Sequence, residues 1–172
     1  MEKIIKLNNA EITIDKLKVV VKGKKGTLEK DLSSPLFNNY IKIESVDGSV
    51  KVSSSKDNRK IKAAVGMFAA MIQTLAKGVA EGYEQKLKIV YMHFPVTVKV
   101  SGKEVLITNF LGEKAGRKAD IIGDAKVEIK GDEITVTGIS KEDVGQTSGN
   151  MEIATRIKAR DRRVYQDGIF KV

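Results

Sequence analysis

The sequence repeats the same order of elements twice, and this repetition constrains the fold more than any other feature. In the first half, short runs alternate apolar and polar residues at 12–32 and again at 41–52, with turn residues between the runs. The second half has the same order at 96–107 and 127–136. Alternation with a period of two, interrupted by turn residues, predicts strands joined as hairpins.

Each half then changes to a helical period. From Arg59 onward, apolar residues fall three or four positions apart, which predicts one face of an amphipathic helix. Asp57 or Asn58 is placed to cap its start. In the second half, Ser140 begins a shorter helical stripe, with Asp143 three residues later, which approximates a capping box. The first helix has its predicted inner face at Ile61, Val65, Phe68, Ile72, Leu75 and Val79.

Strands that are grouped before one helix, instead of alternating with helices, predict the α+β class. We therefore expect two tandem duplicated domains, each of mainly antiparallel β-strands packed with one α-helix. The predicted boundary gives an N-terminal repeat at 1–84 and a C-terminal repeat at 85–172. Each half is small, so we expect each hydrophobic core to give only low stability.

The residue types needed for catalysis or metal binding are scarce. The chain has no cysteine and one histidine, His93, which we interpret as a packed residue at the entry of a strand. The glycine-rich stretch 23–26 joins two predicted strands and therefore lacks the strand-to-helix context of a nucleotide-binding loop. We expect no enzyme activity, cofactor, metal site or small-molecule substrate. Gly145 and Gly149, four residues apart, indicate close packing or the close approach of another backbone.

No membrane-spanning segment is predicted. The first residues, 1–7, lack the apolar core of a secretory signal. The most apolar stretch, 63–72, is much shorter than the roughly 20 residues of a membrane helix. We expect a cytoplasmic protein.

The chain has 31 basic and 22 acidic side chains, a net charge of +9. This surplus favours a polyanionic partner, although a solvated basic surface remains an alternative. In residues 156–172, six basic side chains face two acidic ones, and arginine suits bidentate contacts with phosphate. Apolar residues and an Asp167-Gly168 turn would fold this segment back; a solvated end with Asp161 paired to an arginine is the alternative. The predicted RNA-binding residues are Lys103, Lys114, Arg117, Lys118, Arg156, Lys158, Arg160, Arg162, Arg163 and Lys171.

Several short blocks resemble one known family. They are Leu17–Gly23 with Gly26-Thr27-Leu28, Asn58-Arg59-Lys60, Val90–Pro95, Asn109–Lys114, and Arg160–Arg163 with Asp167-Gly168-Ile169. Together, in this order and across nearly the whole chain, they resemble the universal large-subunit ribosomal protein six. The arginine-rich run followed by Asp-Gly-Ile is similar to the archaeal form of that family.

The resemblance implies a duplicated α+β fold and a place on 23S-type ribosomal RNA near the sarcin-ricin region. It also implies that the C-terminal domain is the main RNA-binding half, close to other large-subunit proteins at the base of the stalk. Two other interpretations compete with it. A basic enzyme acting on an anionic substrate would lack a general base, metal ligands and a nucleotide loop. A free nucleic-acid-binding protein would share the basic surface but would not stay with ribosomal subunits.

Overall fold

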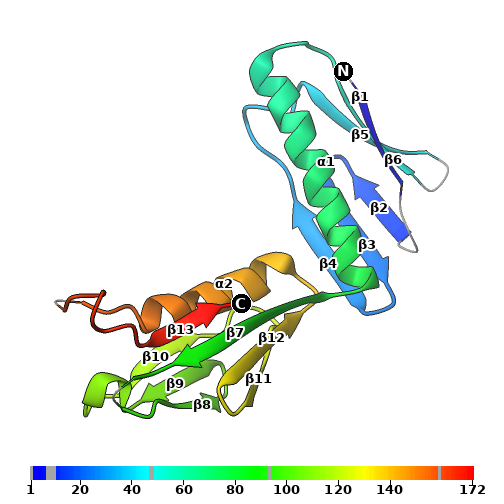
Figure 1. Cartoon of the computed structure of the whole chain (residues 1–172). Coiled ribbons are helices and arrows are strands. Elements are labelled where there is room, and N and C mark those ends of the chain that lie inside the picture. The colour runs from blue at the N-terminus through cyan, green and yellow to red at the C-terminus, as the bar shows by residue number, and fades with distance from the viewer. Residues whose placement is uncertain (1, 7–10, 47–48, 93, 159) are drawn as a thin grey trace. The chain divides into compact units, whose positions relative to one another are not determined.

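The computed structural model describes residues 2–6, 11–46, 49–92, 94–158 and 160–172, and the chain divides into two compact units, Met1–Gly82 and Tyr83–Val172 (Figure 1). The predicted turn at Asp47-Gly48 and His93 lie outside the described residues. The division follows Gly82, two residues before the boundary inferred from the sequence. That 1–84 and 85–172 fold as separate domains stays a prediction.

The first unit contains two antiparallel three-stranded sheets and one helix. One sheet has the order β1-β6-β5 and the other the order β2-β3-β4. The strands are β1 (Glu2–Lys6), β2 (Glu11–Asp15), β3 (Lys18–Gly23), β4 (Gly26–Asp31), β5 (Ile41–Val46) and β6 (Ser49–Ser54), and the helix is α1 (Arg59–Ala80).

Helix α1 is the centre of the first core and contacts strands of both sheets. Its predicted stripe is confirmed: Phe68 and Ile72 are fully buried, while Leu75 is half-buried. The helix begins after Asn58, as expected, but the Asn58 side chain makes no capping hydrogen bond. By length and hydropathy alone α1 could cross a membrane, but 44% of its apolar window is buried inside this unit. The core helix of a soluble protein passes the same test of length and hydropathy, so this finding is weak evidence for a membrane span.

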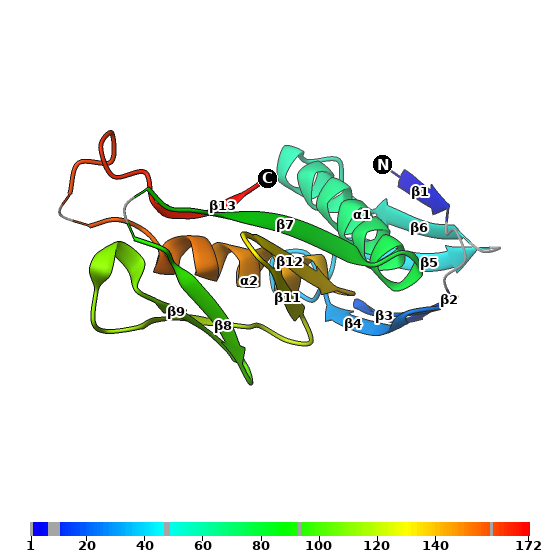
Figure 2. The ribbon, with the colours of Figure 1, turned by 60° about the horizontal axis from the view of Figure 1, so that its bottom comes forward.

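The second unit repeats this arrangement and adds a strand. Its sheets have the orders β11-β12-β7-β13 and β10-β9-β8, and α2 contacts both (Figure 2). The elements are β7 (Tyr83–Val90), β8 (Thr97–Ser101), β9 (Glu104–Thr108), a 3-10 turn (Phe110–Gly112), β10 (Arg117–Asp120), β11 (Lys126–Lys130), β12 (Glu133–Gly138), α2 (Lys141–Ala154) and β13 (Gly168–Lys171).

The two units have matching topologies. Strand β1 pairs with β6, which pairs with β5, and in the same way β7 pairs with β12, which pairs with β11. The predicted α+β class and duplication are therefore confirmed. The sequence interpretation missed β1, β7, β10 and β13. The first strand of each unit pairs with a strand more than 40 residues later, so no hairpin turn marks it.

Helix α2 covers the core of the second unit. Ser140 caps it as predicted, since the Asp143 backbone N–H donates to the Ser140 Oγ at 3.3 Å. Its buried residues are Val144, Thr147, Ser148 and Met151. The two buried hydroxyls are satisfied: the Ile122 N–H donates to the Thr147 Oγ1 at 3.0 Å, and Ser148 donates to the Val144 carbonyl.

The two glycines of α2 lie on its open side. A Cβ atom added at Gly145 or at Gly149 would meet no atom within 4 Å. Close packing within the chain, one of the two sequence-based explanations, is therefore wrong. The other explanation, close approach of another backbone, stays a prediction.

Candidate nucleic-acid interface

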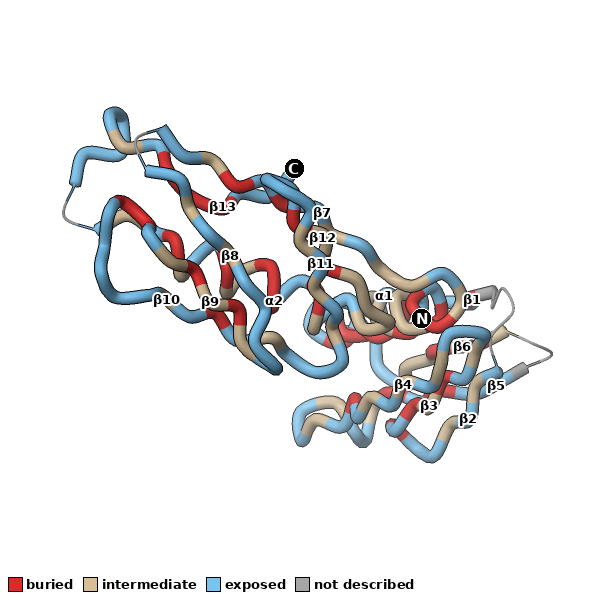
Figure 3. The backbone as a smooth tube through the Cα atoms, turned by 90° about the horizontal axis from the view of Figure 1, so that it is seen from below, coloured by how far each residue is buried: buried red, intermediate tan, exposed pale blue. Residues whose placement is uncertain are grey.

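The basic segment, residues 156–167, is a loop with both ends fixed to the second unit. It leaves the end of α2 and enters β13, which pairs with β7. Buried Thr155 closes the neck of the loop: its Oγ1 accepts from the Ile169 N–H at 3.0 Å and donates to the Met151 carbonyl at 3.1 Å. Between these anchors most of the segment is exposed (Figure 3). The cations are thus displayed from a defined loop and not from a free tail.

Asp167 is a second anchor. Its side chain is buried, and its Oδ1 accepts a hydrogen bond from the Met92 N–H at 2.9 Å. The predicted Asp167-Gly168 turn is wrong, because Gly168 is the first residue of β13. The chain turns earlier, at 162–164, where the N–H groups of Val164 and Tyr165 donate to the Asp161 carbonyl. The carboxylate of Asp167 accepts a hydrogen bond from the backbone of Met92, which is far away in the sequence. A local turn signal cannot reveal such a contact.

The arginines of the basic segment differ in what they contact. The Arg163 Nη2 lies 2.9 Å from the Asp161 Oδ2, and this hydrogen bonding lowers the pKa of Asp161. The Arg160 guanidinium lies 5.0 Å from the centre of the Tyr165 ring, within the range of a cation–π contact. Pairing of Asp161 with an arginine, the alternative considered for this segment, is therefore present for one arginine. Three exposed cations have no side-chain partner within the described ranges: Arg156, Lys158 and Arg162.

Arg117 is placed differently from what the sequence suggested. It is the first residue of β10, and its side chain is only 23% exposed. Its Nε and Nη2 donate to Glu113 at 2.8 and 2.6 Å, and its Nη1 donates to the carbonyls of Ala154 and Arg156 at 2.9 and 3.2 Å. The guanidinium also lies 4.4 Å from the centre of the Phe110 ring. Arg117 therefore ties the preceding loop to the start of the basic segment, and the hydrogen bond from Arg117 lowers the pKa of Glu113.

The predicted lysines of this unit also differ in whether they form ion pairs. Lys103 and Lys114 are exposed, with no ion pair to any residue that the structure describes. The Lys118 Nζ lies 2.9 Å from the Glu104 Oε2, and Lys171 lies 3.7 Å from a carboxylate of α2. The structure therefore separates the ten predicted residues into exposed unpaired cations, exposed paired cations and the internally bonded Arg117.

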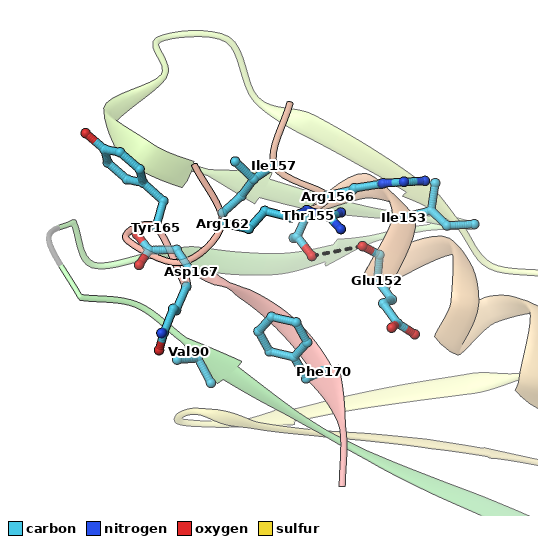
Figure 4. Close-up of a pocket in the computed structure, with 11 residues that line it drawn as sticks. Val90, Glu152, Ile153, Thr155, Arg156, Ile157, Arg162, Tyr165, Asp167 and Phe170 are labelled. Carbon is cyan, nitrogen blue, oxygen red and sulfur yellow. Dashed lines mark hydrogen bonds between the residues drawn. The ribbon is translucent and has the colours of Figure 1, made fainter. Parts of the chain in front are cut away.

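A pocket lies where the basic segment, the end of α2 and β13 meet (Figure 4). Its volume is about 640 Å³, and Arg156 and Arg162 are among the residues that line it. The sequence interpretation missed Thr155 altogether and assigned Asp167 to a turn, although both are buried polar side chains that shape this region. Thr155 stands in no motif, and the Asp167-Gly168-Ile169 block marks Asp167 through the family resemblance alone, so the hydrogen bonds of these two side chains could not be read from the sequence. Among the described residues, no group of three or more His, Cys, Asp or Glu side chains could hold a metal ion.

Comparison with known proteins decides the family. The chain is 46% identical over 160 residues to the large ribosomal subunit protein uL6 of Methanocella arvoryzae, an alignment that covers 92% of this chain and 88% of that protein. It is 50% identical over 151 residues to uL6 of Methanosarcina mazei, covering 88% and 84%. The chain belongs to the uL6 family.

The family model described as ribosomal protein L6 matches residues 94–168. This range lies within the second unit and contains all the predicted RNA-binding residues except Lys171. A further uL6 relative, from Methanobrevibacter smithii, is 45% identical over 162 residues, 94% of this chain and 89% of its own length. The family resemblance inferred from short blocks, and its archaeal character, are therefore confirmed.

Proposed function

We propose that this chain is a structural constituent of the large ribosomal subunit that binds 23S-type ribosomal RNA and catalyses nothing. The observation that carries this proposal is the relation to uL6 proteins of the large subunit at 46 and 50% identity over about nine-tenths of the chain. Its compartment is the cytoplasm, on the ribosome.

The second unit, corresponding to the proposed C-terminal domain at 85–172, is the main RNA-binding half. The basic segment supports this assignment because its neck is closed by Thr155 and its far end is held by Asp167. Holding a loop in place before binding reduces the conformational entropy lost when RNA docks. The exposed cations Arg156, Lys158 and Arg162 are then available to phosphates.

The mode of recognition is contact with phosphates and with the shape of folded RNA. Only 5% of the residues are aromatic, too few for the stacking platform of a sheet that reads single strands. The ion pair with Asp161 orients the exposed Arg163 side chain, whose Nη2 lies 2.9 Å from the Asp161 Oδ2. Arg117 has a supporting role in this proposal, because its hydrogen bonds to Ala154 and Arg156 position the start of the basic segment.

The place on the subunit is near the sarcin-ricin region, with large-subunit proteins at the base of the stalk as neighbours. This finer placement rests on the family relation and on the location of the cations in the second unit. Crosslinking the intact chain to RNA within large subunits, followed by sequencing, tests it. Crosslinks confined to another region of 23S-type RNA would exclude the placement while leaving the subunit assignment intact.

A salt titration tests the RNA-binding surface. Each phosphate contact that is removed should lower the slope of log affinity against log salt by about 0.7 to 0.9. The variant with Arg160, Arg162 and Arg163 all changed to Ala should therefore lose about two units of slope. The control variant changes three exposed lysines of the first unit to Ala and removes the same charge; they are Lys3, Lys24 and Lys42.

The expected result is a much smaller slope change in the control variant than in the arginine variant. Equal changes would mean that diffuse charge dominates and that the basic segment is not the site. Cofractionation addresses the alternative function, a free nucleic-acid-binding protein. A subunit constituent stays with large subunits through high-salt washing, whereas a free protein leaves at modest salt.

A further inference from the structure

The pocket beside the basic segment combines features that the proposed phosphate contacts do not use. Its volume of about 640 Å³ lies within the usual range for small-molecule sites. Phe170 of β13 and Ile157 of the basic segment stand on opposite sides, with Thr155 and Arg162 between them (Figure 4). Phe170 is a large apolar side chain, yet it is 44% exposed.

A buried acceptor without a donor lies in the wall of this pocket. Asp167 is 1% exposed, and its Oδ1 is occupied by the Met92 N–H. Its Oδ2 is buried and accepts no hydrogen bond from the residues that the structure describes. A buried carboxylate oxygen without a donor costs free energy, so the site is incomplete without an N–H or O–H group from elsewhere. The buried hydroxyl of Thr155, by contrast, already has partners in Met151 and Ile169.

Cations line the same pocket. The guanidinium groups of Arg156 and Arg162 are exposed and unpaired within the described part of the chain. The one acidic side chain besides Asp167 in the lining is Glu152, which is 3.7 Å from Lys171 and so partly compensated. A ligand that suits this pocket must therefore carry a flat or apolar body, a hydrogen-bond donor and a negative charge.

A nucleotide meets these three requirements together. We propose that the pocket takes one unpaired nucleotide of the ribosomal RNA. Its base lies against Phe170 and donates an N–H to the Asp167 Oδ2, while its phosphate lies between Arg156 and Arg162. A lysine or arginine from a protein partner would satisfy Asp167 but would be repelled by the two arginines. The inference rests on the proposed function and adds a site for one base to it.

Asp167→Asn separates the two roles of this side chain. Asparagine keeps one oxygen to accept from the Met92 N–H and replaces the free acceptor by an NH₂ donor. The intact ¹⁵N-labelled chain is titrated with AMP, CMP, GMP and UMP, with ribose 5-phosphate as the probe that lacks a base. The backbone amide NMR signals of Ile153, Gly168 and Ile169 report on binding in or next to the pocket.

In the unaltered chain, at least one nucleotide should bind about fivefold or more tightly than ribose 5-phosphate, the gain expected from one stacked base. In Asp167→Asn, the preferred nucleotide should lose that advantage. The inference is overturned if the five ligands bind alike, which would mean charge alone. It is also overturned if Asp167→Asn responds as the unaltered chain does, which would mean that Asp167 holds only water.

A second variant covers the case in which Asp167→Asn does not fold. Phe170→Leu should remove the base-dependent gain and keep the affinity for ribose 5-phosphate, and Ile122→Ala, at an exposed position outside the pocket lining, serves as its control. An unchanged gain in Phe170→Leu overturns the inference. The proposed function is tested separately, by the salt slope with ribosomal RNA in the variant that lacks Arg160, Arg162 and Arg163. A failure of the nucleotide pocket can therefore be told apart from a failure of the proposed function.

Discussion

Changing Gly145 and Gly149 to alanine should stabilise the second unit. Both glycines lie inside α2, and an added Cβ would meet nothing within 4 Å. Glycine in a helix interior costs conformational entropy that alanine does not. Nothing on this side of the helix opposes the two methyl groups.

The expected gain is about 0.5 to 1 kcal/mol for each site, or about 1 to 2 kcal/mol for the double variant. For a unit of this size, 1 kcal/mol corresponds to about 4 to 8 °C in Tm. The thermal transition of the second unit should therefore rise by about 5 to 15 °C, measured by calorimetry on the intact chain. Gly66→Ala is the matched control, since Gly66 lies in α1 and is equally open. It should stabilise the first unit instead.

A lower Tm in the double variant would refute the reasoning, because it would mean that these positions need glycine within the folded chain. Affinity for the ribosomal RNA fragment, measured on the same samples, tests the hypothesis that another backbone approaches this face. That hypothesis predicts weaker binding despite higher stability, with Gly66→Ala unaffected. Unchanged binding in the double variant would reject it.

Three further predictions concern single side chains. In Gly23→Ala the new Cβ would lie 2.8 Å from both the Cγ2 atom and the carbonyl oxygen of Val79. This overpacking should lower the free energy of unfolding by about 1 to 3 kcal/mol and so lower the urea midpoint; an unchanged midpoint would contradict the prediction. Arg117→Gln should cost about 1 to 3 kcal/mol in thermal unfolding but leave the RNA salt slope nearly unchanged, because the guanidinium is used in hydrogen bonds within the chain. A slope lower by about 0.9 would instead mean that Arg117 contacts a phosphate. Hydrogen bonding by Arg163 lowers the pKa of Asp161 in the folded protein. The stabilisation from this pair is therefore fully present above the ordinary Asp pKa of about 3.9, and it is lost only as pH falls through the lower pKa of the folded state. The NMR signal of the Arg163 Nε–H should accordingly stay constant down to about pH 4. A titration midpoint of this signal at or above about pH 3.9 would be inconsistent with the pairing.

The sequence by itself determined both helices, the hairpins and the duplication. The period of the apolar residues after Arg59 and the position of Ser140 predicted where both helices begin, because such patterns depend on neighbours three or four positions away. The hairpins followed from alternation and turn residues for the same reason. The concentration of arginines in one segment was also visible, since composition needs no coordinates.

Only the tertiary structure decided which strands pair across long distances and which charges have partners. Strand β7 alternates like any other strand, but its neighbours are β12 and β13, which are distant in the chain. Arg117 and Arg162 are indistinguishable as letters, yet one is bonded to Glu113 and two carbonyls while the other lines a pocket. Asp167 looked like part of a turn and instead holds the Met92 N–H. Burial and hydrogen bonding depend on all the groups that folding brings near a side chain, and these come from segments that the local sequence does not specify.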